Sequence, residues 1–294
     1  MESKTKLHIC KYQGAGNDFV LIDNRQGLYS NLDYKQIALL CDRRFGVGAD
    51  GLMLLEKHEK YPFCMRFFNS DGMPGSMCGN GGRCISAFAL RLGLVKENEP
   101  FGFWSSDGAH QATVISQLGS HCMVRLQMRD VSCYACNKDR NVFLLDTGSP
   151  HYVAFRTECQ NIDVVAEGRK IRFSDHFPLG VNVDFVENEG SALLVRTYER
   201  GVEDETFSCG TGAVASAMAK ALKEYALSGH HRTDITTKGG QLQVDFELSS
   251  APRDPEKSEI FALPPRFSLL RNRVFTQVFL EGLATFVFEA DIEL

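Results

Sequence analysis

Two segments of the chain share one design around a cysteine. Residues 69–95 read NSDGMPGSMCGNGGRCISAFALRLGLV, and residues 198–224 read YERGVEDETFSCGTGAVASAMAKALKE. In each, a polar loop leads to Cys-Gly-Asn-Gly or Cys-Gly-Thr-Gly, and apolar residues then recur at helical spacing. These positions are Ile85, Phe88, Ala89 and Leu92 in the first segment and Val214, Met218, Ala221, Leu222 and Tyr225 in the second. The pattern predicts one helix after Cys78 and another after Cys209, each rich enough in small residues to pack among strands.

The rest of the chain consists mostly of short β-rich runs separated by turn signals. The predicted strands are 19–23, 51–56, 112–117, 122–128, 141–146, 181–187, 241–248, 276–280 and 284–294. We expect an α+β fold of two pseudo-symmetric, duplicated lobes, each a β-rich sheet or barrel wrapped around a central helix. The N-terminal lobe would span 1–130, with the strand 283–294 returning to it, and the C-terminal lobe 131–282. Residues 249–273 include a charged, proline-containing excursion to which the sequence assigns no role.

Composition excludes several classes of partner. The 294 residues carry a formal net charge of −5, so no basic field attracts nucleic acid or an anionic membrane. No apolar run approaches the roughly 18 to 20 residues that span a bilayer. The first residues lack the apolar core of a signal peptide, and the ten cysteines are scattered. We therefore expect reduced thiols and a cytoplasmic protein.

A cysteine followed by glycine at a helix start has a distinct chemistry. The first N–H groups of a helix lack internal partners, and the helix dipole makes that end partly positive. Such an end binds anions and favours a thiolate, which would lower the cysteine pKa toward neutrality. Two such ends could hold one carboxylate with a thiol on either side of the adjacent α-carbon. One thiolate would then remove a proton and the opposite thiol would return one, without an electron-sink cofactor.

At this level of detail the chain resembles the diaminopimelate epimerase family over nearly its whole length. The motifs are K-x-x-G-x-G-N-D-F (11–19), G-V-G-A-D-G-L (46–52), F-N-S-D-G (68–72), M-C-G-N-G-G-R-C (77–84), S-P-H-Y-V (149–153), G-V-N-V-D-F-V (180–186), Y-E-R-G-V (198–202) and S-C-G-T-G-A (208–213). The resemblance implies interconversion of LL- and meso-diaminopimelate on the route to lysine and peptidoglycan. It also implies a homodimer, a small-molecule substrate, no cofactor and no metal.

The resemblance further implies a role for individual residues. The acid/base thiols would be Cys78 and Cys209, tuned by His151 and Glu199. The reacting carboxylate would be held by Gly79, Asn80, Gly210 and Thr211. The remaining amino and carboxylate groups would be bound by Asn17, Asn69, Asn182, Glu199 and Arg200, because a zwitterion calls for an Arg fork beside an acid. The family commonly has Asn where this chain has Ser149, and serine reaches less far.

Other interpretations of the same residues lead to different functions. A proline or hydroxyproline racemase has a similar fold and also uses thiols, but a cyclic monocarboxylate has no distal zwitterion for Arg200 to bind. An isomerase of the phenazine-biosynthesis type is a second rival, against which the paired cysteines argue. A non-catalytic binding module with inert or zinc-bound thiols is a third.

Several further patterns favour ordinary structural roles. Gly46–Gly51 matches a dinucleotide-binding G-x-G-x-x-G, but a helix-like stretch precedes it and a strand follows, which is the reverse of the required order. Cys133 and Cys136 have zinc-knuckle spacing without a second pair to complete four ligands. Cys84, one turn after Cys78, is predicted to pack rather than react.

Overall fold

The chain folds as two compact units, Met1–Leu126 with Glu281–Leu294 (unit 1) and Gln127–Leu280 (unit 2). The computed structural model describes residues 6–75, 77–250, 264–270 and 273–294. The sequence predicts the corresponding boundaries after residues 130 and 282. Most of the predicted excursion, residues 251–263 and 271–272, lies outside the described residues.

Unit 1 is a closed sheet around one helix. Its strands are β1 (Lys6–Gly14), β2 (Asn17–Asp23), β3 (Gly51–Glu56), β4 (Cys64–Asn69), β5 (Phe101–Ser105), β6 (Gly108–Leu118), β7 (His121–Gln127) and part of β17 (Val274–Glu293). Each strand from β1 to β7 pairs with the next along the chain. Strand β17 pairs with both β7 and β1, so the ring is complete. Helix α1 (Tyr34–Cys41) connects β2 to β3, and α2 (Gly79–Arg91) connects β4 to β5.

Unit 2 repeats this order of pairing. Its strands are β8 (Tyr134–Asn137), β9 (Val142–Asp146), β10 (Pro150–Phe155), β11 (Asn182–Glu189), β12 (Ala192–Glu199), β13 (Asp204–Thr206), β14 (Gly229–Thr237), β15 (Gly240–Ser249) and β16 (Phe267–Leu270). Strands β9 to β12 pair antiparallel, parallel and antiparallel, as β1 to β4 do. Helix α3 (Val164–Arg172) corresponds to α1, and α4 (Gly210–Lys223) to α2. The predicted α+β fold with an internal duplication is therefore confirmed.

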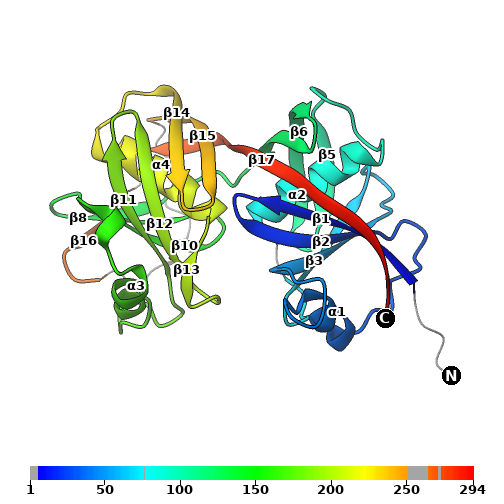
Figure 1. Cartoon of the computed structure of the whole chain (residues 1–294). Coiled ribbons are helices and arrows are strands. Elements are labelled where there is room, and N and C mark those ends of the chain that lie inside the picture. The colour runs from blue at the N-terminus through cyan, green and yellow to red at the C-terminus, as the bar shows by residue number, and fades with distance from the viewer. Residues whose placement is uncertain (1–5, 76, 251–263, 271–272) are drawn as a thin grey trace. The chain divides into compact units, whose positions relative to one another are not determined.

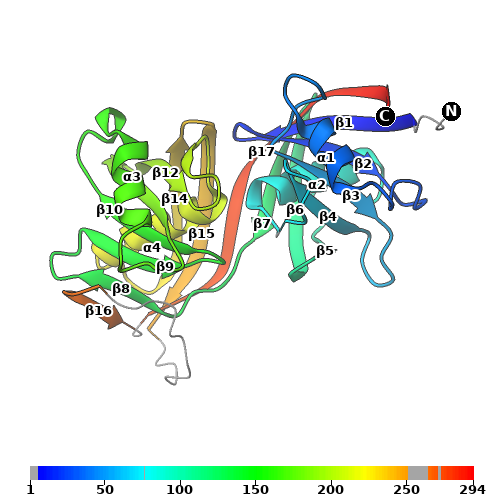
Figure 2. The ribbon, with the colours of Figure 1, turned by 90° about the horizontal axis from the view of Figure 1, so that it is seen from below.

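Each central helix is enclosed by the strands of its own unit (Figure 1). In α2 every residue from Gly79 to Ala89 is buried, and α4 has eleven buried residues out of fourteen. Figure 2 shows the same enclosure from below, with α1 and α3 outside the sheets. Glycine, alanine and serine make up most of the buried residues of the two helices, so the strands can approach closely. The N-terminus of each central helix thereby becomes a rigid, fixed point in its unit.

The sequence pattern does not predict every strand. It predicts separate strands at 276–280 and 284–294, whereas β17 runs unbroken through Gly282. Strand β14 was missed because its residues are mostly polar and half-exposed. Strand β16 lies inside the predicted excursion and pairs with β8. Among the described residues, no helix is long and apolar enough to cross a membrane.

Candidate active site

Cys78 is the N-cap residue of α2, as the sequence predicted. Its backbone is extended, with φ −111° and ψ 133°, and its half-buried side chain makes no capping hydrogen bond to the helix. The Sγ atom lies 3.7 Å from Oδ1 of Asn17. Asn17 follows a tight turn in which Ala15 and Gly16 have φ of 53° and 82°, and this turn sets the start of β2 beside the helix. Two segments far apart in sequence therefore meet at the thiol.

A chain of polar contacts runs from Asn17 into the helix. Asn80 Nδ2 donates to Asn17 Oδ1 at 3.3 Å, and Arg83 Nη2 donates to Asn80 Oδ1 at 2.8 Å. On its other side Asn17 Nδ2 donates to Asp50 Oδ2 at 2.5 Å. Arg83 was not among the predicted site residues, although it stands in the same Cys-Gly-Asn-Gly-Gly-Arg motif.

Asn69 lies at the same edge of the sheet as Asn17. Gly51 pairs with Phe19 on one side and with Asn69 on the other. The start of β2, the start of β3 and the end of β4 therefore share one edge, and the side chain of Asn69 is exposed there. The sequence-predicted residues of unit 1, namely Asn17, Asn69, Cys78, Gly79 and Asn80, all lie at the N-terminus of α2 or at this edge.

Cys209 is the N-cap residue of α4 and is buried. Its Sγ lies 3.4 Å from Oγ1 of Thr211. The same Thr211 hydroxyl is 2.9 Å from His151 Nε2 and 3.1 Å from Ser149 Oγ. A continuous polar path therefore joins the thiol to the imidazole through Thr211.

The imidazole of His151 is fixed from behind by Asp184. Nδ1 of His151 lies 2.7 Å from Asp184 Oδ2, and both side chains are 0% exposed. Thr197 Oγ1 donates to the other oxygen of Asp184 at 2.7 Å. Because the carboxylate accepts, Nδ1 carries a hydrogen, and Nε2 faces the hydroxyl groups of Thr211 and Ser149. Asp184 is not among the predicted site residues, although an acid within the apolar run of β11 is a signal for it.

Asn182, Glu199 and Arg200 lie at the matching edge of unit 2. Asn182 Nδ2 donates to Ser149 Oγ at 3.1 Å, and Asn182 Oδ1 accepts from the Arg200 backbone N–H at 2.8 Å. The Arg200 guanidinium donates to the Leu179 carbonyl at 3.2 Å. Ser149 therefore reaches its neighbours despite its short side chain, since it contacts Asn182, His151 and Thr211.

The electrostatics at Cys209 differ from the prediction. Burial raises the pKa of the Cys209 thiol well above its ordinary value, and the charges of Glu199 and Asp184 raise it further. Hydrogen bonds from Thr211 and from the Gly212 N–H lower it by less. The shift is therefore opposite to the predicted lowering toward neutrality, because removal from water outweighs these hydrogen bonds.

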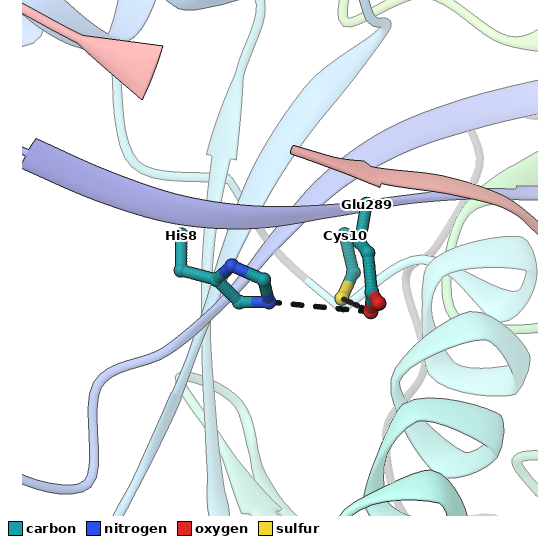
Figure 3. A group of neighbouring side chains, drawn as sticks. All are labelled: His8, Cys10 and Glu289. Carbon is teal, nitrogen blue, oxygen red and sulfur yellow. Dashed lines mark hydrogen bonds and ion pairs between the residues drawn. The ribbon is translucent and has the colours of Figure 1, made fainter. Parts of the chain in front are cut away.

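One group of metal-ligating side chains lies apart from these helix ends. His8, Cys10 and Glu289 converge on neighbouring positions of β1 and β17, as Figure 3 shows. Arg91 Nη2 already donates to Glu289 Oε2 at 2.7 Å, and His8 Nδ1 lies 2.8 Å from Asp291. The Arg91 guanidinium therefore already pairs with the Glu289 carboxylate, and these contacts form a cross-strand ionic network. Cys133 and Cys136 belong to no such group among the described residues.

Solved structures share the fold of this chain at low sequence identity. A PhzF-family phenazine biosynthesis protein from Bacillus anthracis has a TM-score of 0.69 and 11% identity, covering 98% of this chain and 99% of that one. A hydroxyproline epimerase from Agrobacterium vitis has a TM-score of 0.68 and 15% identity, covering 100% and 94%. The fold is therefore the one found in this group of epimerases and phenazine biosynthesis proteins.

Sequence comparison assigns the family. The model of the family described as diaminopimelate epimerase matches residues 9–121 and 143–251. The diaminopimelate epimerase of Flavobacterium psychrophilum is 42% identical, covering 97% of this chain and 100% of the relative. That of Aquifex aeolicus is 36% identical, covering 92% and 99%. The chain belongs to the diaminopimelate epimerase family and is an isomerase of the epimerase class.

Proposed function

We propose that the chain interconverts LL- and meso-2,6-diaminopimelate by proton exchange between the α-carbon and two thiols, Cys78 and Cys209. Membership of the family supports the substrate. The observation that carries the mechanism is that both cysteines are N-cap residues of the two corresponding central helices. Each unit thus offers one thiol beside a set of backbone N–H donors.

The proposed step is balanced by the two sulfur atoms alone. One thiolate removes the α-proton and becomes a thiol, while the pair of electrons passes into the carbanion and its carboxylate. The opposite thiol gives its proton to the other face of the carbon and becomes a thiolate. The configuration inverts because donor and acceptor serve opposite faces, which requires both thiols to reach one α-carbon.

The carbanion is the difficult species, since an amino-acid α-proton is only very weakly acidic. Backbone N–H groups at Gly79-Asn80 and Gly210-Thr211 would stabilise the charge as it spreads into the carboxylate. These donors sit on helices that their own units enclose, so little reorganisation accompanies the reaction. We therefore infer no electron-sink cofactor in this step.

The distal zwitterion requires polar groups of both signs. Asn17 and Asn69 in unit 1 and Asn182, Glu199 and Arg200 in unit 2 are proposed to bind it and the reacting amino group. Both sets lie at the sheet edge next to the cysteine of their unit. His151 is proposed to act on Cys209 through Thr211, and Glu199 through its charge.

The cellular setting follows from this activity. The enzyme would supply meso-diaminopimelate for lysine and peptidoglycan precursors, in the cytoplasm and as a homodimer. The pathway and the homodimer rest on the family, and the cytoplasmic setting rests on the scattered cysteines.

The test is proton NMR of LL-diaminopimelate with reduced, metal-free protein in deuterated water. Loss of the α-proton signal with growth of the meso isomer is expected. No exchange by folded, reduced protein would overturn the proposal. Arg200→Ala separates the rival substrates, since it should abolish turnover of diaminopimelate, whereas a proline-type racemase would not depend on a distal cation.

A further inference from the structure

Asp184 is a carboxylate buried beneath the first turn of α4. Its side chain is 0% exposed, and among the described residues its only ion-pair partner is the imidazole of His151, at 2.7 Å. Thr197 Oγ1 donates to the other carboxylate oxygen, also at 2.7 Å. A Cβ on Gly212 would lie 2.4 Å from that oxygen, so the helix packs directly against the carboxylate. Because a buried charge without a partner is costly, the position of His151 is tied to that of Asp184.

The groups around the second imidazole nitrogen can all donate a hydrogen. Nε2 of His151 lies 2.9 Å from the Thr211 hydroxyl and 3.0 Å from that of Ser149. The side-chain amide nitrogen of Asn182 lies 3.4 Å from it, and the orientation of this amide follows from its oxygen, which accepts from the Arg200 backbone N–H at 2.8 Å. An amide NH2 group donates only, so a hydrogen on Nε2 would point at a donor. The surroundings therefore favour a hydrogen on Nδ1 and a lone pair on Nε2.

The Thr211 hydroxyl stands between this lone pair and the Cys209 sulfur. Its Oγ1 lies 2.9 Å from Nε2 and 3.4 Å from Sγ. Thr147 Oγ1 donates to the Thr211 backbone carbonyl at 2.9 Å, which fixes the residue in the first turn of α4. A hydroxyl accepts hydrogen bonds through its oxygen and donates its single hydrogen. With a hydrogen on Nδ1, all donors can therefore point the same way, from the thiol through Thr211 to the imidazole and on to Asp184.

A base at Cys209 needs such a path for its proton. Burial raises the pKa of this thiol, and the charges of Glu199 and Asp184 raise it further, so the empty protein holds the thiol protonated. Transfer of that proton to the imidazole would place a positive charge beside Asp184 and reverse the hydrogen bonds of Thr211. Thr211 would then donate to the sulfur, and this hydrogen bond lowers the pKa of the thiol. The hydroxyl serves both states because it only has to rotate its hydrogen.

We propose that Asp184 is a positioning residue, which holds His151 with its Nε2 lone pair toward Thr211, and that the Thr211 hydroxyl relays a proton between Cys209 and His151. The sulfur gives its hydrogen to Thr211 Oγ1 as Thr211 gives its own to Nε2. Cys209 becomes a thiolate, His151 becomes an imidazolium and Thr211 regains a hydroxyl, while Asp184 keeps its charge. The inference rests on the proposed function for its catalytic consequence, since the thiolate so formed is the base that removes the α-proton.

The first experiment locates the hydrogens on His151 in the substrate-free full chain, grown with isotope-labelled histidine. Long-range proton–nitrogen NMR distinguishes a protonated from a bare ring nitrogen, and His151→Gln assigns the signals. In the wild-type protein at neutral pH we expect a hydrogen on Nδ1 and none on Nε2. Asp184→Asn should raise the population with hydrogen on Nε2, because an amide can donate to Nδ1 where a carboxylate only accepts. A wild-type imidazole with a hydrogen on Nε2, alone or together with one on Nδ1, would overturn the proposal.

Turnover of LL-diaminopimelate then tests the relay. Thr211→Val keeps the backbone and shape but not the hydroxyl, and should lower kcat about 10²-fold with KM changed less than about threefold, the scale of general acid–base catalysis. Thr211→Ser should restore most of that loss. Asp184→Asn should lower kcat similarly, and the double variant Asp184→Asn/Thr211→Val should lose at most about threefold more, because both changes break one path. Thr237→Val is the matched control, since it removes a buried hydroxyl that donates to the Gly240 carbonyl elsewhere in unit 2, and should stay near wild type.

Two kinetic results would overturn the proposal. Losses that multiply in the double variant would mean that Asp184 and Thr211 act separately, and an unchanged kcat in Thr211→Val would mean that no proton passes its hydroxyl. Where Asp184→Asn does not fold, the wild-type spectrum and the two Thr211 variants decide. The NMR readout needs no substrate, so a chain that does not epimerise diaminopimelate but shows the expected imidazole would contradict the proposed function and support the positioning of His151 by Asp184.

Discussion

The N-termini of α2 and α4 have the same backbone design but different surroundings. Strand pairing shows which positions of the two units correspond. Gly51 of β3 pairs with Phe19 of β2 and with Asn69 of β4. Asn182 of β11 pairs in the same way with His151 of β10, so Gly51 corresponds to Asn182. The match continues two residues further along, where Met53 corresponds to Asp184. The helix glycines that pack against these two positions support the correspondence. A Cβ added to Gly81 of α2 would lie 3.3 Å from Met53 Sδ, and one added to Gly212 of α4 would lie 2.4 Å from Asp184 Oδ1.

The two units therefore support their thiols in different ways. Below Cys209 the sheet supplies a hydrogen-bonded acid and imidazole, and α4 has the apolar Val214 where α2 has Arg83. At the position of unit 1 that corresponds to Asp184 the sheet supplies the apolar Met53, and a buried charge sits within the helix at Arg83. Duplication fixed where each thiol stands, while the polarity around it diverged. Two chemically distinct thiols suit a reaction in which one begins as base and the other as acid.

The largest effect is expected on catalysis, from removing either thiol. Cys78→Ala and Cys209→Ala should each lower epimerisation by about 10³-fold or more, because each removes one of two obligatory proton carriers. Exchange into deuterated water measures this, and Cys64→Ala should remain close to wild type. Near-normal turnover in either single variant would show that its thiol is dispensable and that the two units are not partners.

The matched positions under the helices should differ in stability. Asp184→Leu leaves the buried donors of His151 and Thr197 without an acceptor, at a cost of about 1–3 kcal/mol for each. Met53→Leu keeps volume and polarity at the corresponding place and should cost less than about 1.5 kcal/mol. Urea denaturation compares the two. Equal losses would mean that the two sites are supported alike.

Gly81 and Gly212, which pack against Met53 and Asp184, allow the same comparison of stability with smaller expected effects. Gly212→Ala forces a methyl group against the fixed carboxylate of Asp184 and should cost about 1–3 kcal/mol. Gly81→Ala meets the flexible Met53 side chain, which can yield, so less than about 1 kcal/mol is expected. Thermal unfolding of both variants tests this. A greater loss for Gly81→Ala would contradict the alignment of the two units.

The smallest effect concerns pH, and its sign differs between Asp18 in unit 1 and Cys209 in unit 2. Burial would raise the pKa of Asp18, but hydrogen bonds and charges of Arg43 and Lys11 together lower it to about 2. Its stabilisation is present above the unfolded pKa of about 3.9 and is lost as pH falls toward 2. The raised pKa of Cys209 acts oppositely, since its stabilisation is present below about 8.5 and is lost as pH rises further.

Unfolding midpoints across pH separate these two contributions. Asp18→Asn should reduce the slope of the acid limb and leave the alkaline limb unchanged. Cys209→Ala should reduce the slope of the alkaline limb, to which other buried thiols also contribute, and leave the acid limb unchanged. A variant that moved both limbs together would indicate a general loss of stability.

Local pattern sufficed for much of the fold. The predicted strand 51–56 has the same first and last residue as β3, and both central helices begin directly after the predicted cysteines. Such signals survive because glycine and apolar spacing act within a few residues. The continuity of β17 and the polar strand β14 depend on partners elsewhere in the chain, which local pattern does not carry.

The candidate site was predictable where motif and chemistry coincide. The contact of Asn17 with Cys78 joins two predicted residues, and so does the path from His151 to Thr211. Asp184 and Arg83 are not predicted as site residues, because a charged residue is usually solvated and only the fold shows that these two are buried. The raised pKa of the Cys209 thiol is not predictable for the same reason, since dehydration of the sulfur depends on how the chain packs.

Strand β17 also orders the events of biosynthesis. Unit 1 is closed by the pairing of Lys6 with Glu293 and its neighbours, so its last strand follows all of unit 2 along the chain. A ribosome adding about 5–20 residues per second exposes β1 and β7 for many seconds before their shared neighbour exists. Unpaired strand edges are prone to associate with other chains in that interval. The nascent N-terminal half is accordingly the stage at which we expect this protein to depend on chaperones, although its finished sheet has no open edge there.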